Sequence, residues 1–408
     1  MTRFETCPIS RRRFLRRAAS TGIAAVGAPA ILNALGANET IRLGAIGTGG
    51  RGQRLVEEFR RQGGVEFLSV CDVYPDHLEK GAQKAGEQVD KVVDYRRVLD
   101  RKDVDAVMIA TPEHQHAVPL IDAVNAGKDV YIEKPLSHTI AEGREMVQAA
   151  RKNERIVQVG MQQRSAPHFL EARDVVQSGR LGDVHLVTSY WYQDFLSHQT
   201  AKWTLPGGLD WKRFLGSAPF RKLEDNPGRF WDWRYYWDYS GGALCDNGTH
   251  VNDWVDMLMG DKESPISATC TGGKYVIKRW DTPDVFSAAF EYQSGWLATL
   301  SFNYTESYPF GHFHESQFHG TDGLLKISRR GWSFYERGNP EPKESHEERG
   351  SHAFHVRNFL QCVRSRKRPT ADIEIGHRAV TTSHLGNMAY RQGRKVLFDA
   401  VKREVKQG

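Results

Sequence analysis

Apolar runs and amphipathic stretches alternate along the first part of this chain, from about residue 40 to residue 160. The apolar runs predict strands at 41–47, 65–71, 106–110, 129–132 and 156–159. The 3.6-residue spacing of apolar positions predicts helices between them, including helices at 119–125 and 141–151. Strands that alternate with helices pair in parallel, because each crossover returns the chain to the same end of the sheet. We therefore expect an α/β domain with a doubly wound parallel sheet.

The pattern changes after residue 162. Apolar and polar positions now alternate, which predicts strands at 184–192, 266–277, 285–292, 295–304, 313–319 and 324–328. Short turns join antiparallel neighbours, so we expect an α+β domain with a large, mostly antiparallel open sheet. The helical period returns near the end of the chain and predicts helices at 355–365 and 376–391.

A glycine-rich turn joins the first expected strand to the helix that follows it. Its sequence, Gly47-Thr48-Gly49-Gly50-Arg51-Gly52, fits the pattern G-x-G-x-x-G. One glycine permits the tight turn, one lets the backbone approach a diphosphate, and one allows close helix packing. The N–H groups at the helix N-terminus favour the anion. Six such residues alone are equally typical of an ordinary glycine-rich turn.

Asp72 adds the context that favours a nucleotide site. It stands at the end of the second expected strand, about 20 residues after Gly52, where a carboxylate accepts hydrogen bonds from the adenosine ribose. A carboxylate in this place repels a 2′-phosphate. The sequence therefore predicts a Rossmann domain at residues 38–160 that binds NAD rather than NADP, followed by a second domain at 161–408.

Two further motifs stand at strand ends. Thr111-Pro112, followed by His116, comes after the third expected strand, and Glu133-Lys134-Pro135 comes after the next. With the glycine turn, their order and spacing resemble the Gfo/Idh/MocA family of sugar and cyclitol oxidoreductases. The resemblance implies that Lys134 bridges the nicotinamide ribose and a substrate hydroxyl, and that the bond before Pro135 is often cis. Without the family match, Lys134 is read more simply as a surface lysine.

The resemblance also implies which residues contact the cofactor. The expected contacts are Gly47, Thr48, Gly49, Gly50, Arg51, Gly52, Asp72, Thr111, Pro112, His116, Glu133, Lys134 and Gln162.

A third constellation lies in the second domain. Asp246 and His250 are four residues apart, so on one helix they share a face, and the apolar positions at 251–258 continue the helical period. This matches the family's D-x-x-x-H element, which implies that His250 accepts a proton and that Asp246 orients the substrate and the imidazole. Hydride removal from an alcohol releases a proton that a histidine can take. A helix-capping Asp246 with a structural His250 is the alternative.

Other residues near the expected site carry weaker signals. Arg164 follows a strand end and is expected to contact substrate. Six of the ten tryptophans lie in residues 190–240, where core packing or an oligomer contact is expected for most and a sugar contact for one or two. His312 and His314 alternate on one strand, but no third ligand stands at a recognisable spacing, so no metal is expected.

The first 37 residues have the three-part layout of an export signal. Residues 10–16, Ser-Arg-Arg-Arg-Phe-Leu-Arg, fit the twin-arginine consensus, and a mildly apolar stretch follows at 18–35. A membrane anchor or a basic amphipathic helix is the alternative, but glycines and a proline interrupt this short stretch. The sequence therefore predicts passage through the twin-arginine translocase to a periplasmic or exported location, with no stable membrane span.

Setting the leader aside changes the charge of the chain. The formal net charge is +6, and six arginines against Glu5 give the first 37 residues +5, which leaves +1 for the rest. A near-neutral chain gives no support to a nucleic-acid partner. The five cysteines are scattered without C-x-x-C spacing, so neither a zinc cluster nor a disulfide framework is indicated.

The expected function is oxidation or reduction of a hydroxyl on a sugar, sugar acid or cyclitol. Because free NAD is scarce outside the cytoplasm, the cofactor is expected to be tightly held. One alternative is a redox-neutral glycoside-cleaving enzyme, as found among some relatives of the family, and another is a non-catalytic carbohydrate-binding protein. The family's open sheet often supports oligomers, which implies a homo-oligomer here.

Overall fold

The structure is a computed structural model that describes residues 40–306, 313–348, 350 and 352–406. The expected export leader at 1–37 lies outside the described residues. Residues 42–408 form one compact unit. Within the described part, no helix has both the length and the apolar character needed to cross a membrane.

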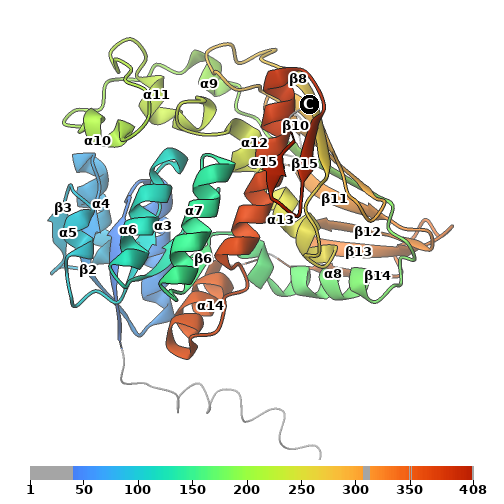
Figure 1. Cartoon of the computed structure of the whole chain (residues 1–408), viewed down its shortest axis with the longest axis horizontal. Coiled ribbons are helices and arrows are strands. Elements are labelled where there is room, and N and C mark those ends of the chain that lie inside the picture. Colours follow the sequence, from blue (N-terminus) through green and yellow to red (C-terminus); the bar gives the residue numbers. More distant parts are fainter. Residues whose placement is uncertain (1–39, 307–312, 349, 351, 407–408) are drawn as a thin grey trace, which may run out of the picture. The chain divides into compact units, whose positions relative to one another are not determined.

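The first half of the chain forms a six-stranded sheet with the order β3-β2-β1-β4-β5-β6 (Figure 1). Its pairings for which a register is defined are all parallel. Strands β4 and β5 are buried along their whole length, as parallel strands with both faces covered must be. The doubly wound parallel sheet is thus confirmed. Its elements are β1 (Ile41–Ile46), α3 (Gly50–Gln62), β2 (Val65–Cys71), α4 (Pro75–Ala85), β3 (Asp90–Val92), α5 (Arg96–Leu99), β4 (Ala106–Ile109), α6 (Ala117–Asn125), β5 (Asp129–Ile132), α7 (Ile140–Lys152) and β6 (Val157–Val159).

The second half contains a ten-stranded sheet with the order β14-β13-β12-β11-β7-β10-β9-β8-β15-β16. Only the β7–β10 pairing is parallel among the pairings with a defined register, so the mostly antiparallel sheet is confirmed. Strands β7 and β10 alternate buried and partly exposed residues. The strands are β7 (Leu186–Tyr192), β8 (Ser267–Gly273), β9 (Val285–Glu291), β10 (Leu297–Asn303), β11 (Phe313–His319), β12 (Gly323–Ser328), β13 (Gly331–Glu336), β14 (Glu344–Glu347), β15 (Val396–Asp399) and β16 (Glu404–Val405).

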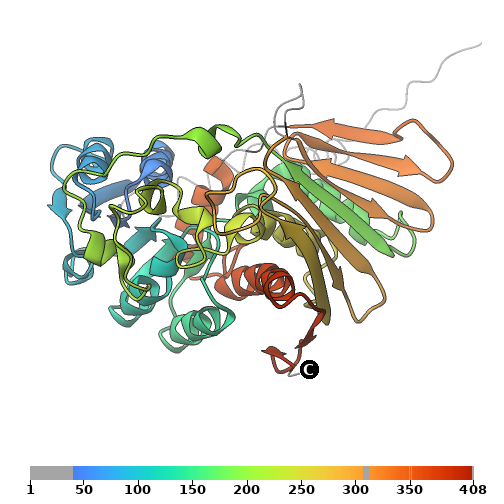
Figure 2. The same ribbon diagram turned by 90° about the horizontal axis from the view of Figure 1, so that it is seen from above.

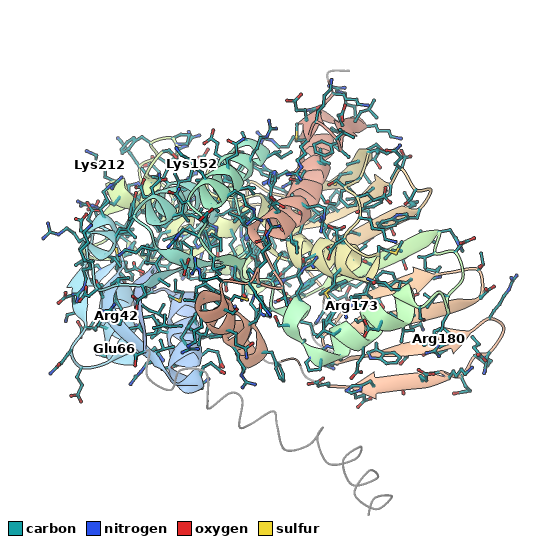
Figure 3. The ribbon with its side chains drawn as sticks, turned by 60° about the horizontal axis from the view of Figure 1, so that its bottom comes forward. Arg42, Glu66, Lys152, Arg173, Arg180 and Lys212 are labelled. Atoms are coloured by element: carbon teal, nitrogen blue, oxygen red, sulfur yellow. The ribbon has the colours of Figure 1, made fainter. Side chains whose placement is uncertain are left out.

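Helices pack against one face of this sheet (Figure 2). They are α8 (Pro167–Gln177), α13 (Gly248–Leu258) and α15 (Ile373–Gln392), and α14 (His352–Ser365) packs against α3. Every residue of α13 is buried. The core between helices and sheet contains large aromatic side chains such as Trp191, Trp254 and Phe302. Charged side chains, among them Arg42, Glu66 and Lys152, project outward around the unit (Figure 3).

The helix expected to carry both Asp246 and His250 is in fact two helices. Asp246 is the last residue of α12 (Gly242–Asp246), and His250 lies in the first turn of α13. In one continuous helix the His250 N–H would bond the Asp246 carbonyl, but here it bonds the carbonyl of Asn247 at 3.1 Å. The Asp246 carbonyl instead accepts a hydrogen bond from Lys134 Nζ at 2.8 Å. A side chain from the first domain thus takes the place of a helical bond.

Candidate active site

The glycine turn has the geometry that its sequence predicts. Gly47 has φ +84°, and a Cβ there would lie 2.7 Å from the Ala110 carbonyl carbon. A Cβ on Gly52 would lie 2.1 Å from the Gly47 oxygen, so both positions need glycine. Helix α3 begins at Gly50, and no side chain of the described chain caps it. Its first N–H groups are therefore directed at an open end that suits a diphosphate.

Asp72 lies beside this turn, at the carboxyl end of β2. One carboxylate oxygen accepts the Thr48 N–H at 2.7 Å and the other accepts the Tyr74 N–H at 2.9 Å. Burial raises the pKa of Asp72, and these hydrogen bonds and His77 oppose the rise. The glycine turn and the acid are thus joined as the fingerprint requires, and contact between Asp72 and a ribose stays a prediction.

His116, which was expected among the cofactor contacts, has both ring nitrogens next to backbone carbonyl oxygens. It is buried, with Nδ1 2.8 Å from the Pro135 carbonyl oxygen and Nε2 2.9 Å from that of Thr111. Both ring nitrogens thus face carbonyl oxygens, and in the neutral ring the nitrogen that carries the hydrogen donates to one of them. His116 ties the turn after β4 to the turn after β5, where the Lys134–Pro135 bond is cis, as the resemblance implied. Its part in the site is to position these turns.

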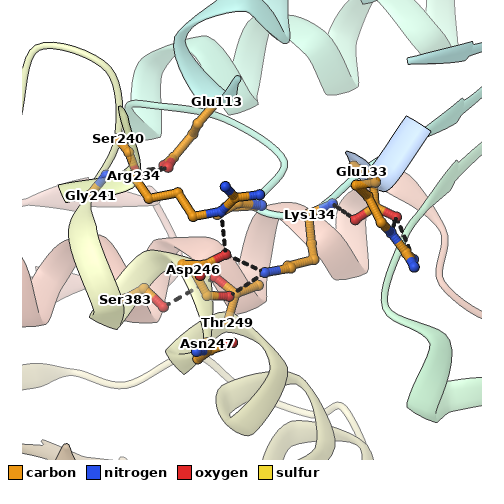
Figure 4. Close-up of polar contacts among 12 residues, drawn as sticks. Glu113, Glu133, Lys134, Arg234, Ser240, Gly241, Asp246, Asn247, Thr249 and Ser383 are labelled. Atoms are coloured by element: carbon orange, nitrogen blue, oxygen red, sulfur yellow. Dashed lines mark hydrogen bonds and ion pairs between the residues drawn. The ribbon is translucent and has the colours of Figure 1, made fainter. Parts of the chain in front are cut away.

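Lys134 and Asp246 form the centre of the site (Figure 4). Lys134 Nζ lies 2.5 Å from Asp246 Oδ1, and both side chains are largely buried. Arg234 Nε lies 3.6 Å from the same oxygen. Burial opposes the charge of Asp246, but Lys134 and Arg234 hold the pKa of this carboxyl below its usual range. An ion pair that joins the two domains therefore stands at the end of β5.

Glu133 connects the Lys134 turn to the glycine turn, where the cofactor diphosphate is expected. Its Oε1 accepts a hydrogen bond from Arg51 Nε at 2.6 Å, and its Oε2 accepts the Lys134 N–H at 3.2 Å. The Arg51 guanidinium also lies 3.5 Å from both ring nitrogens of His352. The glycine turn and the Glu133-Lys134-Pro135 turn are thereby held together, so both predicted motifs belong to one site.

His250 is linked to Arg329 through Gln163. With the Gln163 oxygen toward Arg329, it accepts from Nε and Nη2 at 2.7 and 3.1 Å, and the amide nitrogen donates to His250 Nδ1 at 3.1 Å. A guanidinium has no acceptor, so this is the amide orientation that satisfies both neighbours. Burial, followed by the charges of Lys134 and Arg329, lowers the pKa of His250 well below its usual value, so the ring is neutral.

This hydrogen bond fixes the tautomer of His250. A neutral imidazole that accepts at Nδ1 carries its hydrogen on Nε2, and this nitrogen has no hydrogen-bond partner among the described residues. In this arrangement His250 is therefore a donor toward a ligand, whereas the family resemblance implied a proton acceptor. The acceptor role requires the ring hydrogen on Nδ1 and the Gln163 amide turned round.

Gln162 and Arg164, the two other site residues predicted after β6, differ in their surroundings. The buried Oε1 of Gln162 has no hydrogen-bond partner in the described part of the chain, so it suits a donor such as a carboxamide N–H of the cofactor. Arg164 is 4% exposed and binds Asp253 at 2.5 Å and Asp261 at 2.7 Å. All its nitrogens are engaged by acids or backbone. Arg164 is a structural cation, and the expectation of a substrate contact is corrected.

A buried polar cluster that the sequence analysis did not single out adjoins the site. Glu113 Oε2 accepts from Ser240 Oγ at 2.6 Å and from the Gly241 N–H at 3.2 Å, and Oε1 has no partner among the described residues. Burial raises the pKa of Glu113 to about 8. Cys245 and His384 complete the cluster; the three groups are metal-ligand types, with ligand atoms within 4.8 Å of one another. Glu113 follows Pro112, so its position at a strand end was the available signal.

Replacing Glu113 with glutamine is expected to change how stability depends on pH. Because the folded-state pKa is raised from 4.5 to about 8, the folded protein holds this proton more tightly than the unfolded chain does. The resulting stability is complete below pH 4.5 and is lost as the pH rises through about 8. Relative to Glu113→Gln, the unmodified protein should lose at most about 1.4 kcal/mol of unfolding free energy per pH unit across this window. Urea unfolding of both proteins measures the difference, and identical pH profiles would contradict a protonated Glu113.

Residues 194–240 form an irregular segment with the short helices α9 (Ser197–Thr200), α10 (Trp211–Leu215) and α11 (Gly228–Trp231), seen above the first sheet in Figure 1. The Asp210 N–H donates to the Val73 carbonyl at 2.9 Å. The His114 ring lies 2.8 Å from the Phe214 carbonyl. The segment therefore contacts the turns after β2 and β4, where the dinucleotide crevice of such a fold lies.

The aromatic residues of this segment pack mainly on one another. Trp203 stacks on Trp231 with ring centroids 6.0 Å apart, and Trp211 stacks on Phe214 at 4.9 Å. Trp191 alone of the six tryptophans is buried, and the other five are partly exposed, so the choice between core packing, an oligomer contact and a sugar contact stays a prediction. Of the two histidines considered as metal ligands, His314 stacks on Trp191 and His312 lies outside the described residues.

Two family models match this chain. Residues 41–161 match the model described as "Oxidoreductase family, NAD-binding Rossmann fold", and residues 215–326 match the "GFO/IDH/MocA C-terminal domain". Together they cover more than half of the chain. The chain therefore belongs to the Gfo/Idh/MocA oxidoreductase family, and its first domain is an NAD-binding Rossmann domain.

Curated relatives are distant. An uncharacterized oxidoreductase of Streptococcus pneumoniae is 26% identical over 290 residues, 70% of this chain and 68% of that protein. Alpha-N-acetylgalactosaminidase of Shewanella oneidensis is 26% identical over 228 residues, 48% of this chain and 50% of that protein. Inositol 2-dehydrogenase of Salmonella agona is 29% identical over 150 residues, 36% of this chain and 45% of that protein. The matches to the last two thus span half of those proteins or less.

Solved structures share the fold. Levoglucosan dehydrogenase in complex with NADH and levoglucosan superposes with a TM-score of 0.71 at 17% identity, covering 88% of this chain and 99% of that one. The WlbA dehydrogenase from Bordetella pertussis, in complex with NADH and UDP-GlcNAcA, has a TM-score of 0.70 at 20% identity, with coverages of 88% and 99%.

Proposed function

We propose that this protein is an exported oxidoreductase that transfers a hydride between NAD and a hydroxyl of a sugar, sugar acid or cyclitol. The observation that carries the proposal is the Lys134–Asp246 pair, which joins residues 112 apart in the chain at 2.5 Å. This pair stands beside the glycine turn on one side and His250 on the other. The proposal also agrees with the sugars and cyclitols named for relatives and structural neighbours.

When bound, the nicotinamide supplies the hydride acceptor or donor. Lys134 Nζ and the Nε2–H of His250 are two donors that can stabilise the substrate oxygen as it gains negative charge. Asp246 holds the Lys134 ammonium in place. The Nε2–H form of His250 cannot take the hydroxyl proton in the direction of oxidation. Only the other neutral tautomer, which carries its one hydrogen on Nδ1 and donates it to the Gln163 oxygen, could accept that proton at Nε2.

We also propose that the cofactor stays bound through export. The segment 194–240 contacts the turns after β2 and β4 and so can retain a dinucleotide in the crevice. Protein purified from the exported fraction should release about one NAD or NADH per chain on denaturation, identified by mass spectrometry. Substitution of Arg11 and Arg12 with lysine should keep the protein in the cytoplasm. Exported protein without any nucleotide would contradict retention and would favour the non-catalytic carbohydrate-binding alternative.

A second candidate is supported by the alpha-N-acetylgalactosaminidase relative. In this alternative, a sugar hydroxyl is oxidised transiently, the glycosidic leaving group is eliminated, water adds, and the sugar is reduced again. Incubation of the holoprotein with glycosides and no added NAD distinguishes the two functions. Free sugar without net NADH absorbance supports glycoside cleavage, whereas NADH absorbance without free sugar supports the dehydrogenase.

A further inference from the structure

Arg329, the first residue after β12, is a partly buried cation that has no acidic partner in the described part of the chain. Among the described residues no carboxylate lies within 4.0 Å of its guanidinium. The structure does not describe residues 307–312, 349 and 351, and the sequence has no Asp or Glu at these positions. The buried Arg164 shows the usual arrangement, since Asp253 and Asp261 both bind it.

The guanidinium of Arg329 is nevertheless held in a fixed position. Its Cζ lies 4.8 Å from the centre of the Trp191 ring, so one face rests on the aromatic surface. Its Nε and Nη2 both point at the Gln163 oxygen. A guanidinium has five N–H donors, so the donors that do not face Gln163 remain for a ligand. This is a pre-oriented cation rather than a mobile surface arginine.

The surroundings of Arg329 repel it rather than neutralise it. Burial and the charge of Arg51 lower the pKa of Arg329 to about 10, and Asp246 offsets this only in part. Asp246 is already shared between Lys134 and Arg234. The cations around His250 thus outnumber the carboxylates, and a bound anion would restore the balance.

The position of Arg329 indicates which ligand brings the anion. Arg51 stands at the glycine turn, on the side where the cofactor diphosphate belongs. Arg329 comes from the second-domain sheet and connects through Gln163 to His250, on the side where the substrate belongs. The negatively charged partner that Arg329 lacks is therefore assigned to the substrate.

We infer that Arg329 receives an oxyanion carried by the substrate, so that the sugar handled at this site bears a carboxylate or a phosphate. The inference rests on the proposed function, because it takes His250 and Lys134 as the reacting end of the same site. It narrows the substrate class from sugars in general to acidic sugars.

The test compares acidic and neutral sugars on the NAD-loaded protein. Binding of glucose, glucuronate and glucose 6-phosphate, and of galactose and galacturonate, is measured by calorimetry. The acidic member of at least one pair should bind about 10- to 100-fold more tightly than the neutral member. Arg329→Gln should remove this preference, whereas Arg330→Gln, which removes the same charge from the exposed neighbouring residue, should keep it. The better acid, carboxylate or phosphate, identifies the group received.

Three outcomes would overturn the inference. These are equal binding within every pair, an acid preference that survives Arg329→Gln, and a loss of NADH affinity in Arg329→Gln as large as the loss of sugar affinity. The last would assign Arg329 to a cofactor phosphate. Reduction of the bound NAD, followed at about 340 nm in the same samples, tests the proposed function separately. An acid that binds through Arg329 without reducing NAD would contradict the proposed function alone.

Discussion

Lys134→Ala is expected to lower the rate of hydride transfer about 100- to 1,000-fold, the usual cost of removing one donor from a developing oxyanion. The side chain is held by Asp246 through two hydrogen bonds, at 2.8 Å to the backbone oxygen and 2.5 Å to the carboxylate. Without it, Arg234, at 3.6 Å, is the one cation among the described residues that still pairs with Asp246. Formation of NADH in a single turnover of the exported holoprotein is the direct measurement.

Lys152→Ala is the matched control for this variant. Lys152 lies at the end of α7 in the same domain and is exposed, so its loss should leave the rate unchanged (Figure 3). Nucleotide content is measured in each sample, because Lys134 is also expected at the nicotinamide ribose. A Lys134→Ala protein that retains its nucleotide and its full rate would remove Lys134 from the proposed mechanism.

Asp253→Asn is expected to reduce the free energy of unfolding by about 3 kcal/mol, because it leaves a buried guanidinium short of one charge. Asp253 is fully buried and binds Arg164 Nε at 2.5 Å. Burial raises the pKa of Asp253 to about 6, so urea unfolding is measured near pH 8, where the carboxylate is charged. The variant tests whether Arg164 is structural, as its contacts indicate, or binds substrate, as its sequence position suggested.

Asp174→Asn provides the comparison for a surface ion pair. Asp174 is 69% exposed and pairs with Arg173 at 2.7 Å, so its replacement should change stability by less than about 1 kcal/mol. Equal small effects of both substitutions, together with a weaker affinity for sugar in Asp253→Asn, would contradict the structural role of Arg164.

The local pattern of apolar and polar residues was enough to predict those elements that depend on residues close together in the chain. The apolar runs predicted the main strands of both sheets because strand burial alternates or persists over a few residues. The short strands β3 and β14 were missed because almost all their residues are exposed and carry no apolar signal. Strands β13 and β15 were also missed, although buried and more exposed residues alternate in both. The glycine turn was predicted correctly because backbone sterics at Gly47 and Gly52 admit no side chain.

Periodicity failed where a distant side chain replaces a local bond. The positions from Asp246 to Leu258 have a helical period, yet the Lys134 ammonium takes the Asp246 carbonyl and the helix is divided at Asn247. The contacts of His116 could not be predicted from local sequence either, since its ring lies between the carbonyl groups of Thr111 and Pro135 in two different turns.

Local sequence was thus enough to predict the parallel sheet, the mostly antiparallel sheet and the glycine turn with Asp72 beside it, while the roles of Lys134, Asp246 and His250 stay predictions. These features follow from residue type and spacing. Which charges are neutralised depends instead on tertiary contacts: Arg164 pairs with Asp253 across 89 residues of chain, and Arg329 pairs with no described acid. The reason is physical, because the electrostatic free energy of a buried cation depends on which groups the fold brings within a few ångströms, wherever they stand in the chain.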